Sequence, residues 1–211
     1  MSYEPFIDDP EHIREVEGQR FVVLRPTDVV SDYYRELQNV LRRRLSGRPV
    51  SFPAHEHVTL AGFAAGTQLQ SVQELVSVWR QGVPPLRLQV ERAASFPPPS
   101  KILYLEVLKT PALFRALQTL RRMAEERALL LDSVISVDEW IFHMSLAYCP
   151  SLNATEWDLM ARFVEGQPIL DRSSIQDTVE IAAFDGGKEY SGGIYPLTRA
   201  THPSGLEHSR F

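Results

Sequence analysis

The sequence predicts an α+β protein made of two pseudo-symmetric lobes, each an antiparallel sheet flanked by helices, with a cleft between the lobes. A His-x-[Ser/Thr]-apolar pattern occurs in two predicted strands, at His57 and at His143, which are 86 positions apart. The order helix, His-containing strand, helix, strand, turn, strand also occurs twice, with a displacement close to 86. Short turns rich in Gly or Pro join the last two strands of each half, as in antiparallel hairpins.

Composition indicates an ordinary globular protein of 211 residues, with 44% hydrophobic and 23% charged residues. The net charge of −5 gives no positive field for long nucleic acid, so a nucleic-acid partner is expected to be an end or a small nucleotide. Cys149 is the only cysteine, which excludes an intrachain disulfide and a thiol-rich metal site. Neither a membrane span nor a secretory signal is recognisable, so we expect a cytoplasmic monomer.

In the N-terminal half, apolar residues at helical spacing predict two amphipathic helices that end in Gly-containing sequences. Apolar runs and alternating segments between them predict strands. Asp8-Asp9-Pro10 is a candidate cap for a short first helix, and Pro97-Pro98-Pro99-Ser100 is expected to turn between two strands. The expected elements are a helix ending at 15, a strand at 19–24, a helix at 28–45, a strand at 54–61, a helix at 68–81, and strands at 86–96 and 102–107.

The C-terminal half is expected to repeat this order. Thr110-Pro111 should cap a helix, Asn153 with Glu156 fits a capping box, and Asp185-Gly186-Gly187-Lys188 predicts a turn. The expected elements are a helix at 111–128, a strand at 141–148, a helix at 154–164, and strands at 179–184 and 194–197. We therefore expect one domain over residues 1–198, with lobes of about 19–108 and 109–198, with or without exchange of terminal strands, and a flexible tail at 199–211.

The two motifs each place an imidazole and a hydroxyl on one face of a strand, because side chains two apart share a face. The pairs are His57 with Thr59 and His143 with Ser145. The bare triplet is not specific, since His202-Pro203-Ser204 also fits it in the tail. The strand context and the equivalent positions in two lobes favour a functional site over two structural histidines.

Two imidazoles on opposite sides of a cleft suit an in-line displacement at phosphorus, which needs a base on the incoming oxygen and an acid on the leaving one. Histidine can take both roles near neutral pH. The two hydroxyls can donate hydrogen bonds to the non-bridging oxygens. A nucleophilic role for Ser145 is disfavoured, because no acidic residue is placed to orient its histidine and no Gly-x-Ser-x-Gly sequence is present.

The paired motifs, their spacing and the duplicated layout resemble the two-histidine (2H) phosphoesterase superfamily, the LigT-like group of 2′-5′ RNA ligases and cyclic phosphodiesterases. The resemblance spans about residues 19–198. It implies a bilobal fold that opens or forms 2′,3′-cyclic phosphates, or cleaves related phosphodiesters, without a metal or other cofactor. It assigns His57 and His143 to acid/base catalysis and Thr59 and Ser145 to phosphate binding.

The chain departs from many relatives after the second motif, where Ala147-Tyr148 stands in place of an Arg or Lys. Tyr148 is therefore a candidate substrate contact, and Lys101 and Lys188, in near-equivalent turns, are candidate phosphate ligands. Tyr190 or Phe96 could stack on a base, although both fit a hairpin core equally well.

Two further groups of basic residues have alternative interpretations. His55 is expected to share a face with His57, which makes it a further substrate-binding candidate and, with His143, a candidate three-histidine metal site. The predicted helices and the lack of matched carboxylates argue against a metal. Arg42-Arg43-Arg44 suits the negative end of a helix dipole and is, alternatively, a phosphate patch.

The sequence thus predicts a metal-independent phosphodiesterase acting on a small nucleotide or an RNA end. Two alternatives stay open: a binding module that keeps the cleft without turnover, and a structural or regulatory protein with buried histidines. Because both motifs are complete, the enzyme is favoured. The assignment of base and acid between the histidines, the substrate and the direction of reaction stay open.

Overall fold

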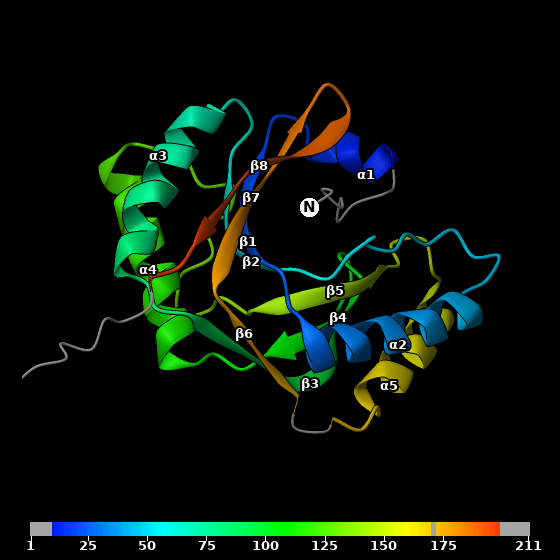
Figure 1. Ribbon diagram of the computed structural model, residues 1–211. Helices are drawn as coiled ribbons and strands as arrows, with labels where there is room; N and C mark the ends of the chain where they lie inside the picture. The colour runs from blue at the N-terminus through cyan, green and yellow to red at the C-terminus, as the bar shows by residue number, and fades with distance from the viewer. Residues whose placement is uncertain (1–9, 170–171, 199–211) are drawn as a thin grey trace, which may run out of the picture.

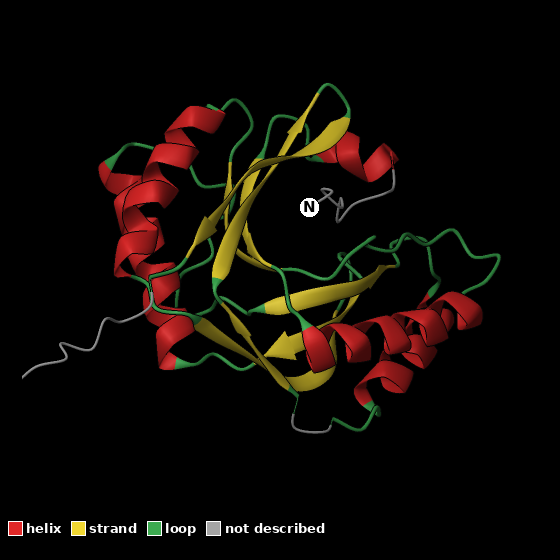
Figure 2. Cartoon of the chain, viewed as in Figure 1, coloured by secondary structure: helices red, strands yellow, loops and turns green. Residues whose placement is uncertain are grey.

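A computed structural model describes residues 10–169 and 172–198, and in it the strands form two four-stranded antiparallel sheets with helices beside each (Figures 1 and 2). The predicted α+β fold with two antiparallel sheets is confirmed. The first sheet has the order β2 (Val58–Phe63), β1 (Arg20–Leu24), β7 (Thr178–Asp185), β8 (Lys188–Pro196). The second sheet has the order β5 (His143–Tyr148), β4 (Ile102–Val107), β3 (Leu86–Phe96), β6 (Ser173–Gln176).

Two helices cover the outer face of each sheet. The first sheet packs against α3 (Leu69–Trp79) and α4 (Pro111–Glu126), and the second against α2 (Asp28–Arg44) and α5 (Ala154–Glu165) (Figure 1). Two short helices, α1 (Pro10–Glu15) and η1 (Arg80–Gly82), complete the described elements. The apolar side chains between sheets and helices form one large buried cluster.

Local capping signals account for two of the helix starts. The Thr110 hydroxyl accepts from the Leu113 amide at 3.2 Å, and Asn153 with Glu156 forms the predicted capping box. Thr27, in contrast, makes no capping hydrogen bond to α2. The proposed cap at 8–9 and the tail at 199–211 lie outside the described residues.

The lobes are not consecutive halves of the chain. The C-terminal hairpin β7–β8 completes the first sheet because β1 pairs with β7 as well as with β2. In addition, α2 packs on β5 and β6 of the second sheet, although it precedes β2 in sequence. The division near residue 108 therefore does not separate the lobes, while the repeat itself holds: β2 and β5 begin at 58 and 143, and α3 and α5 at 69 and 154.

Some element bounds differ from the expectation. The first motif strand begins at Val58 rather than at 54, because the chain bends at residues 54 and 55. The strand β6 was not predicted, since its four residues are mostly polar.

Cys149 is fully buried, and burial raises the pKa of its thiol to about 12. None of the helices in the described residues is both long and apolar enough to cross a bilayer.

Candidate functional site

The two motif strands, β2 and β5, are edge strands of different sheets, and they lie within 8 Å of each other by Cα. The segment leading into β2 runs antiparallel to β5, because Ser51 forms an isolated bridge with Tyr148. The two hydrogen bonds of that bridge measure 3.1 and 2.8 Å. The sheets therefore join along the edges that carry the two motifs.

Helix α2 holds both edges in place. The Tyr34 hydroxyl donates to the Ser145 carbonyl at 2.8 Å. The Gln38 amide donates to the carbonyl of Pro53, before the first motif, at 2.8 Å and to that of Leu146, in the second, at 3.4 Å. All three hydrogen bonds are buried, so one helix fixes the relative position of both motif segments.

The inner face of each sheet is the face turned away from its covering helices. In the first sheet, Val58 and Leu60 contribute to the helix-packed core, while Thr59 lies on the inner face and pairs with Val23. A single carboxylate, Glu180, follows in the same row on β7. His57 precedes β2 by one residue and, by alternation, lies on the side of Thr59.

A β-bulge shapes the inner face of the second sheet. His143 pairs with Glu106 and Ser145 with Tyr104, but the register then shifts so that Leu146 has no cross-strand partner and Tyr148 pairs with Ile102. Strict alternation would place Tyr148 on the opposite face from His143. The bulge instead brings Tyr148 to the face of both motif residues.

Both motif histidines have the same backbone contact. Nδ1 of His57 lies 3.3 Å from the His55 carbonyl, and Nδ1 of His143 lies 3.0 Å from the Ile141 carbonyl. A carbonyl only accepts, so each Nδ1 carries the proton and donates. In each half-buried ring, Nε2 is the nitrogen that this backbone contact does not use.

Aromatic rings surround His143. Phe96 and Tyr104 stack at a centroid distance of 4.1 Å, and their rings lie 5.0 and 5.4 Å from the imidazole in edge-on arrangements. Burial lowers the pKa of His143, while the Ile141 carbonyl and the Glu106 carboxylate act in the opposite direction. Tyr104 was not predicted as a site residue. The sequence did contain a signal for it, because Ile102, Tyr104 and Glu106 are spaced two apart on one predicted strand and so share a face.

We expect the pKa of His143, followed by its imidazole proton shifts in NMR, to lie below the ordinary value of 6.5. Glu106→Gln should lower it further, because the substitution removes a negative charge that stabilises the imidazolium. Glu126→Gln, which changes an exposed carboxylate on α4, is the matched control and should leave the titration unchanged. A rise in the pKa of His143 in Glu106→Gln would contradict this account.

A pocket of about 350 Å³ lies beside His143. Its walls come from the β3–β4 hairpin and from the segment before β5; the lining residues are Phe96, Ser100, Ile102, Asp132, Ser133, Ile135, Glu139, Trp140, Ile141 and His143. Asp132 crosses over Gly62 of β2, where a Cβ would collide with the Asp132 carboxylate. Gly62 thus allows the pocket segment to approach the first sheet.

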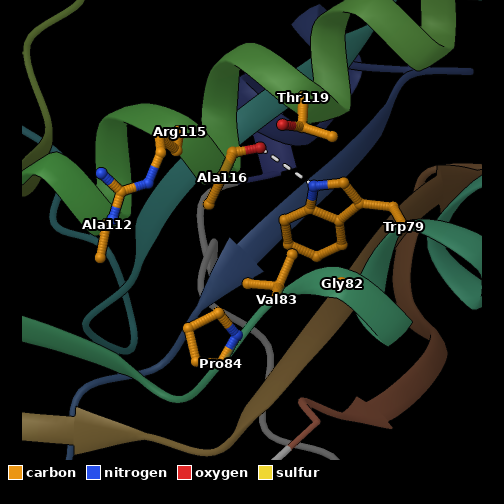
Figure 3. Close-up of a pocket in the computed structure, with 8 residues that line it drawn as sticks. All are labelled: Trp79, Gly82, Val83, Pro84, Ala112, Arg115, Ala116 and Thr119. Atoms are coloured by element: carbon orange, nitrogen blue, oxygen red, sulfur yellow. Dashed lines mark hydrogen bonds between the residues drawn. The ribbon is translucent and has the colours of Figure 1, made fainter. Parts of the chain in front are cut away.

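A second pocket, of about 190 Å³, lies between the end of α3 and the start of α4 (Figure 3). The Trp79 indole on its wall donates to the Ala116 carbonyl at 3.0 Å. None of the predicted site residues lines it. It belongs to the helical layer on the outer side of the first sheet.

Three residues predicted to contact the substrate either lie away from the histidine motifs or form hydrogen bonds within the protein. The Lys101 ammonium donates to the carbonyls of Pro150 and Leu152 and so holds the loop after β5. Lys188 and Tyr190 lie on the β7–β8 hairpin, at the opposite end of β1 from His57.

The glycine-rich turn of that hairpin already binds a carboxylate. The amides of Gly186 and Gly187 donate to Glu17 at 2.6 and 2.9 Å. Tyr190 donates to Asp185, which also pairs with Arg20. The structure therefore does not bring this turn together with the histidine motifs.

The structure also places the other basic residues that were candidates for substrate or phosphate binding. His55 lies in the bend before β2 and provides its carbonyl to His57. Arg42 and Arg44 lie over the rings of Phe52 and Phe163, at 4.4 and 3.9 Å. Over residues 10–169 and 172–198, no group of three or more His, Cys, Asp or Glu side chains is arranged to hold a metal ion.

Two four-stranded antiparallel sheets flanked by helices match the fold of LigT. The sequence matches the family model for the 2′-5′ RNA ligase superfamily over residues 36–170, and the chain belongs to that superfamily. Among curated proteins, none matches the sequence significantly.

Solved structures support the same fold. Escherichia coli LigT complexed with 3′-AMP has a TM-score of 0.54 at 14% identity, covering 86% of this chain and 98% of that one. The protein TT0787 of Thermus thermophilus has a TM-score of 0.63 at 14% identity, covering 86% and 99%. Kluyveromyces marxianus Usb1 has a TM-score of 0.52 at 11% identity, covering 87% and 100%.

Proposed function

We propose that this protein is a metal-independent phosphodiesterase that uses His57 and His143 as a general acid/base pair. The observation that carries the proposal is the matched contact of the two rings. In each, Nδ1 is held by the carbonyl two residues earlier, which supports Nε2 as the nitrogen that transfers the proton. The same contact at equivalent places in two sheets supports a shared role for the two rings.

The lowered pKa of His143 favours it as the base, and His57 then takes the role of the acid. His143, with its lowered pKa, is neutral near pH 7 and takes a proton from the attacking water through Nε2. As the acid, His57 gives the proton from Nε2 to the leaving ribose oxygen. Thr59 and the buried Ser145 donate hydrogen bonds to the non-bridging oxygens as charge builds up on them. In the reverse, ligating direction the acid and the base exchange roles.

The proposed substrate is a small nucleotide with a 2′,3′-cyclic phosphate, or an RNA end with a cyclic or 2′-5′ linkage. Structures of E. coli LigT contain 3′-AMP, ATP, NADP+ or phosphate, which supports a nucleotide ligand. The pocket beside His143 has aromatic walls at Phe96 and Trp140 that suit a base. The net charge of −5 disfavours long nucleic acid.

A panel of diesters tests the proposal: the four 2′,3′-cyclic nucleotides, a 2′-5′ dinucleotide and a 3′-5′ dinucleotide, each with and without EDTA. We expect turnover of a cyclic or 2′-5′ substrate at the same rate in EDTA, with a 2′- or 3′-phosphate identified by ³¹P NMR. Saturable binding without product would instead favour a binding module. Loss of turnover in EDTA would contradict the metal-independent mechanism.

A further inference from the structure

An arginine pinned by a buried carboxylate lies at the end of β1. Nε of Arg25, the first residue after the strand, donates to Oε2 of Glu180 at 2.6 Å. Glu180 is only 6% exposed, and its other oxygen, Oε1, is buried without a hydrogen-bond partner in the described part of the chain. A buried carboxylate is costly unless a cation compensates its charge, and Arg25 does so here.

The strand register places this ion pair beside the first motif. Val23 pairs with Thr59 on one side and with Glu180 on the other, so these residues form one row on the inner face. The next pair in the antiparallel register is Leu24 with Val58. Continuing the register by one residue places Arg25 opposite His57.

The second sheet contains a comparable pair that is less suitably placed. Arg92 pairs with Glu106 at 2.8 Å, and Glu106 in turn lies opposite His143. The strand β4, which carries Glu106, therefore lies between Arg92 on β3 and His143 on β5. The Arg92 side chain is also 64% exposed. No such strand separates Arg25 from His57.

We propose that Arg25, positioned by Glu180, binds the phosphate group of the substrate next to His57 and Thr59. Contact through Nε fixes the plane of a guanidinium, and a fixed guanidinium binds phosphate oxygens with defined geometry. This assignment supplies a cation that the second motif lacks, where Ala147-Tyr148 stands, and that Lys101 and Lys188 do not provide. The inference rests on the proposed function, and its ligand class is a phosphate monoester or diester.

The test measures dissociation constants for inorganic phosphate and for 3′-AMP by calorimetry, in the full chain. Arg25→Met should weaken both by about 10- to 100-fold, because it removes a charged hydrogen-bond donor. Arg25→Lys should recover part of the affinity. Glu180→Gln should weaken binding less than Arg25→Met, and it should raise KM more than it lowers kcat for any diester turned over.

Arg20→Met is the matched control, because Arg20 forms an ion pair with Asp185 at the other end of the same sheet. It should lower Tm and leave phosphate affinity unchanged. The double variant Arg25→Met/Glu180→Gln removes both charges of the ion pair, so no uncompensated carboxylate stays buried. Its phosphate affinity can therefore be measured even if Arg25→Met folds poorly. We expect this affinity to be as weak as that of Arg25→Met.

The inference is overturned if wild-type protein binds neither probe, if Arg25 variants bind as tightly as wild type, or if Arg20→Met loses as much affinity. Failure of the proposed activity is distinguishable from these outcomes. If no diester is turned over but phosphate binding depends on Arg25, the phosphate site stands and the phosphodiesterase proposal fails.

Discussion

Replacing His57 or His143 by alanine is expected to lower kcat/KM for the diester substrate by about 10²–10⁴-fold, the usual contribution of a general acid or base. Each substitution removes the Nε2 to which we assign proton transfer and keeps the backbone carbonyl that held the ring. The measurement is steady-state kinetics on the substrate found in the diester panel. Tm should change little, since both rings are only half-buried.

His55→Ala is the matched control for this prediction. It removes an imidazole two positions from His57 and preserves the carbonyl that accepts from His57 Nδ1. We expect a change of less than about threefold in kcat/KM, well below the loss for a general acid or base. The double variant His57→Ala/His143→Ala should lose about as much as the worse single variant, because the two groups act in one step. Full activity in either single variant would reject the assignment.

Gln38→Leu is expected to lower the free energy of unfolding by about 2–4 kcal/mol, because two buried carbonyls lose their donor and each costs about 1–3 kcal/mol. The carbonyls belong to Pro53 and Leu146, on the two segments that carry the motifs. The same substitution should lower kcat/KM, since the motif edges are no longer tied to one helix. Urea denaturation measures the stability change as a shift in midpoint at constant slope.

Gln70→Leu gives the comparison for that experiment. Gln70 lies on α3, where its amide donates to Glu74 in an exposed hydrogen bond. Its replacement should change the unfolding free energy by no more than about 0.5 kcal/mol and should leave kcat/KM unchanged. Equal effects of the two glutamine substitutions would show that Gln38 does not tie the motif segments together.

Elements defined by local sequence were predictable. The strands at 86–96 and 102–107 have the expected bounds, because alternating apolar residues and a proline turn define the hairpin. The helix α5 begins after Asn153, where the capping box was expected. The approximate positions of the two motif strands also followed from their apolar flanks.

Features that depend on distant pairing were not predictable. The union of β1 with β7 joins residues about 160 positions apart, and local periodicity carries no signal for it. The bulge that turns Tyr148 to the inner face depends on the β4 register rather than on its own sequence. The buried ion pair of Arg25 with Glu180 is likewise visible only once the first sheet is assembled.

The phosphate candidates show the same limit. Lys101 and Lys188 occupy near-equivalent turns of the repeat, as the sequence indicated, but equivalent turns need not face one site. The Lys101 ammonium is used by carbonyls of the loop after β5. The amides beside Lys188 are used by Glu17.

The pH dependence of kcat/KM tests the central claim most directly. Two histidines acting as base and acid should give a bell-shaped profile, whose acid limb lies below the ordinary histidine pKa of 6.5 because burial lowers the pKa of His143. Glu106→Gln should move that limb to still lower pH. A flat profile between about pH 5 and 8, or a bell that persists unchanged in both His57→Ala and His143→Ala, would contradict the account.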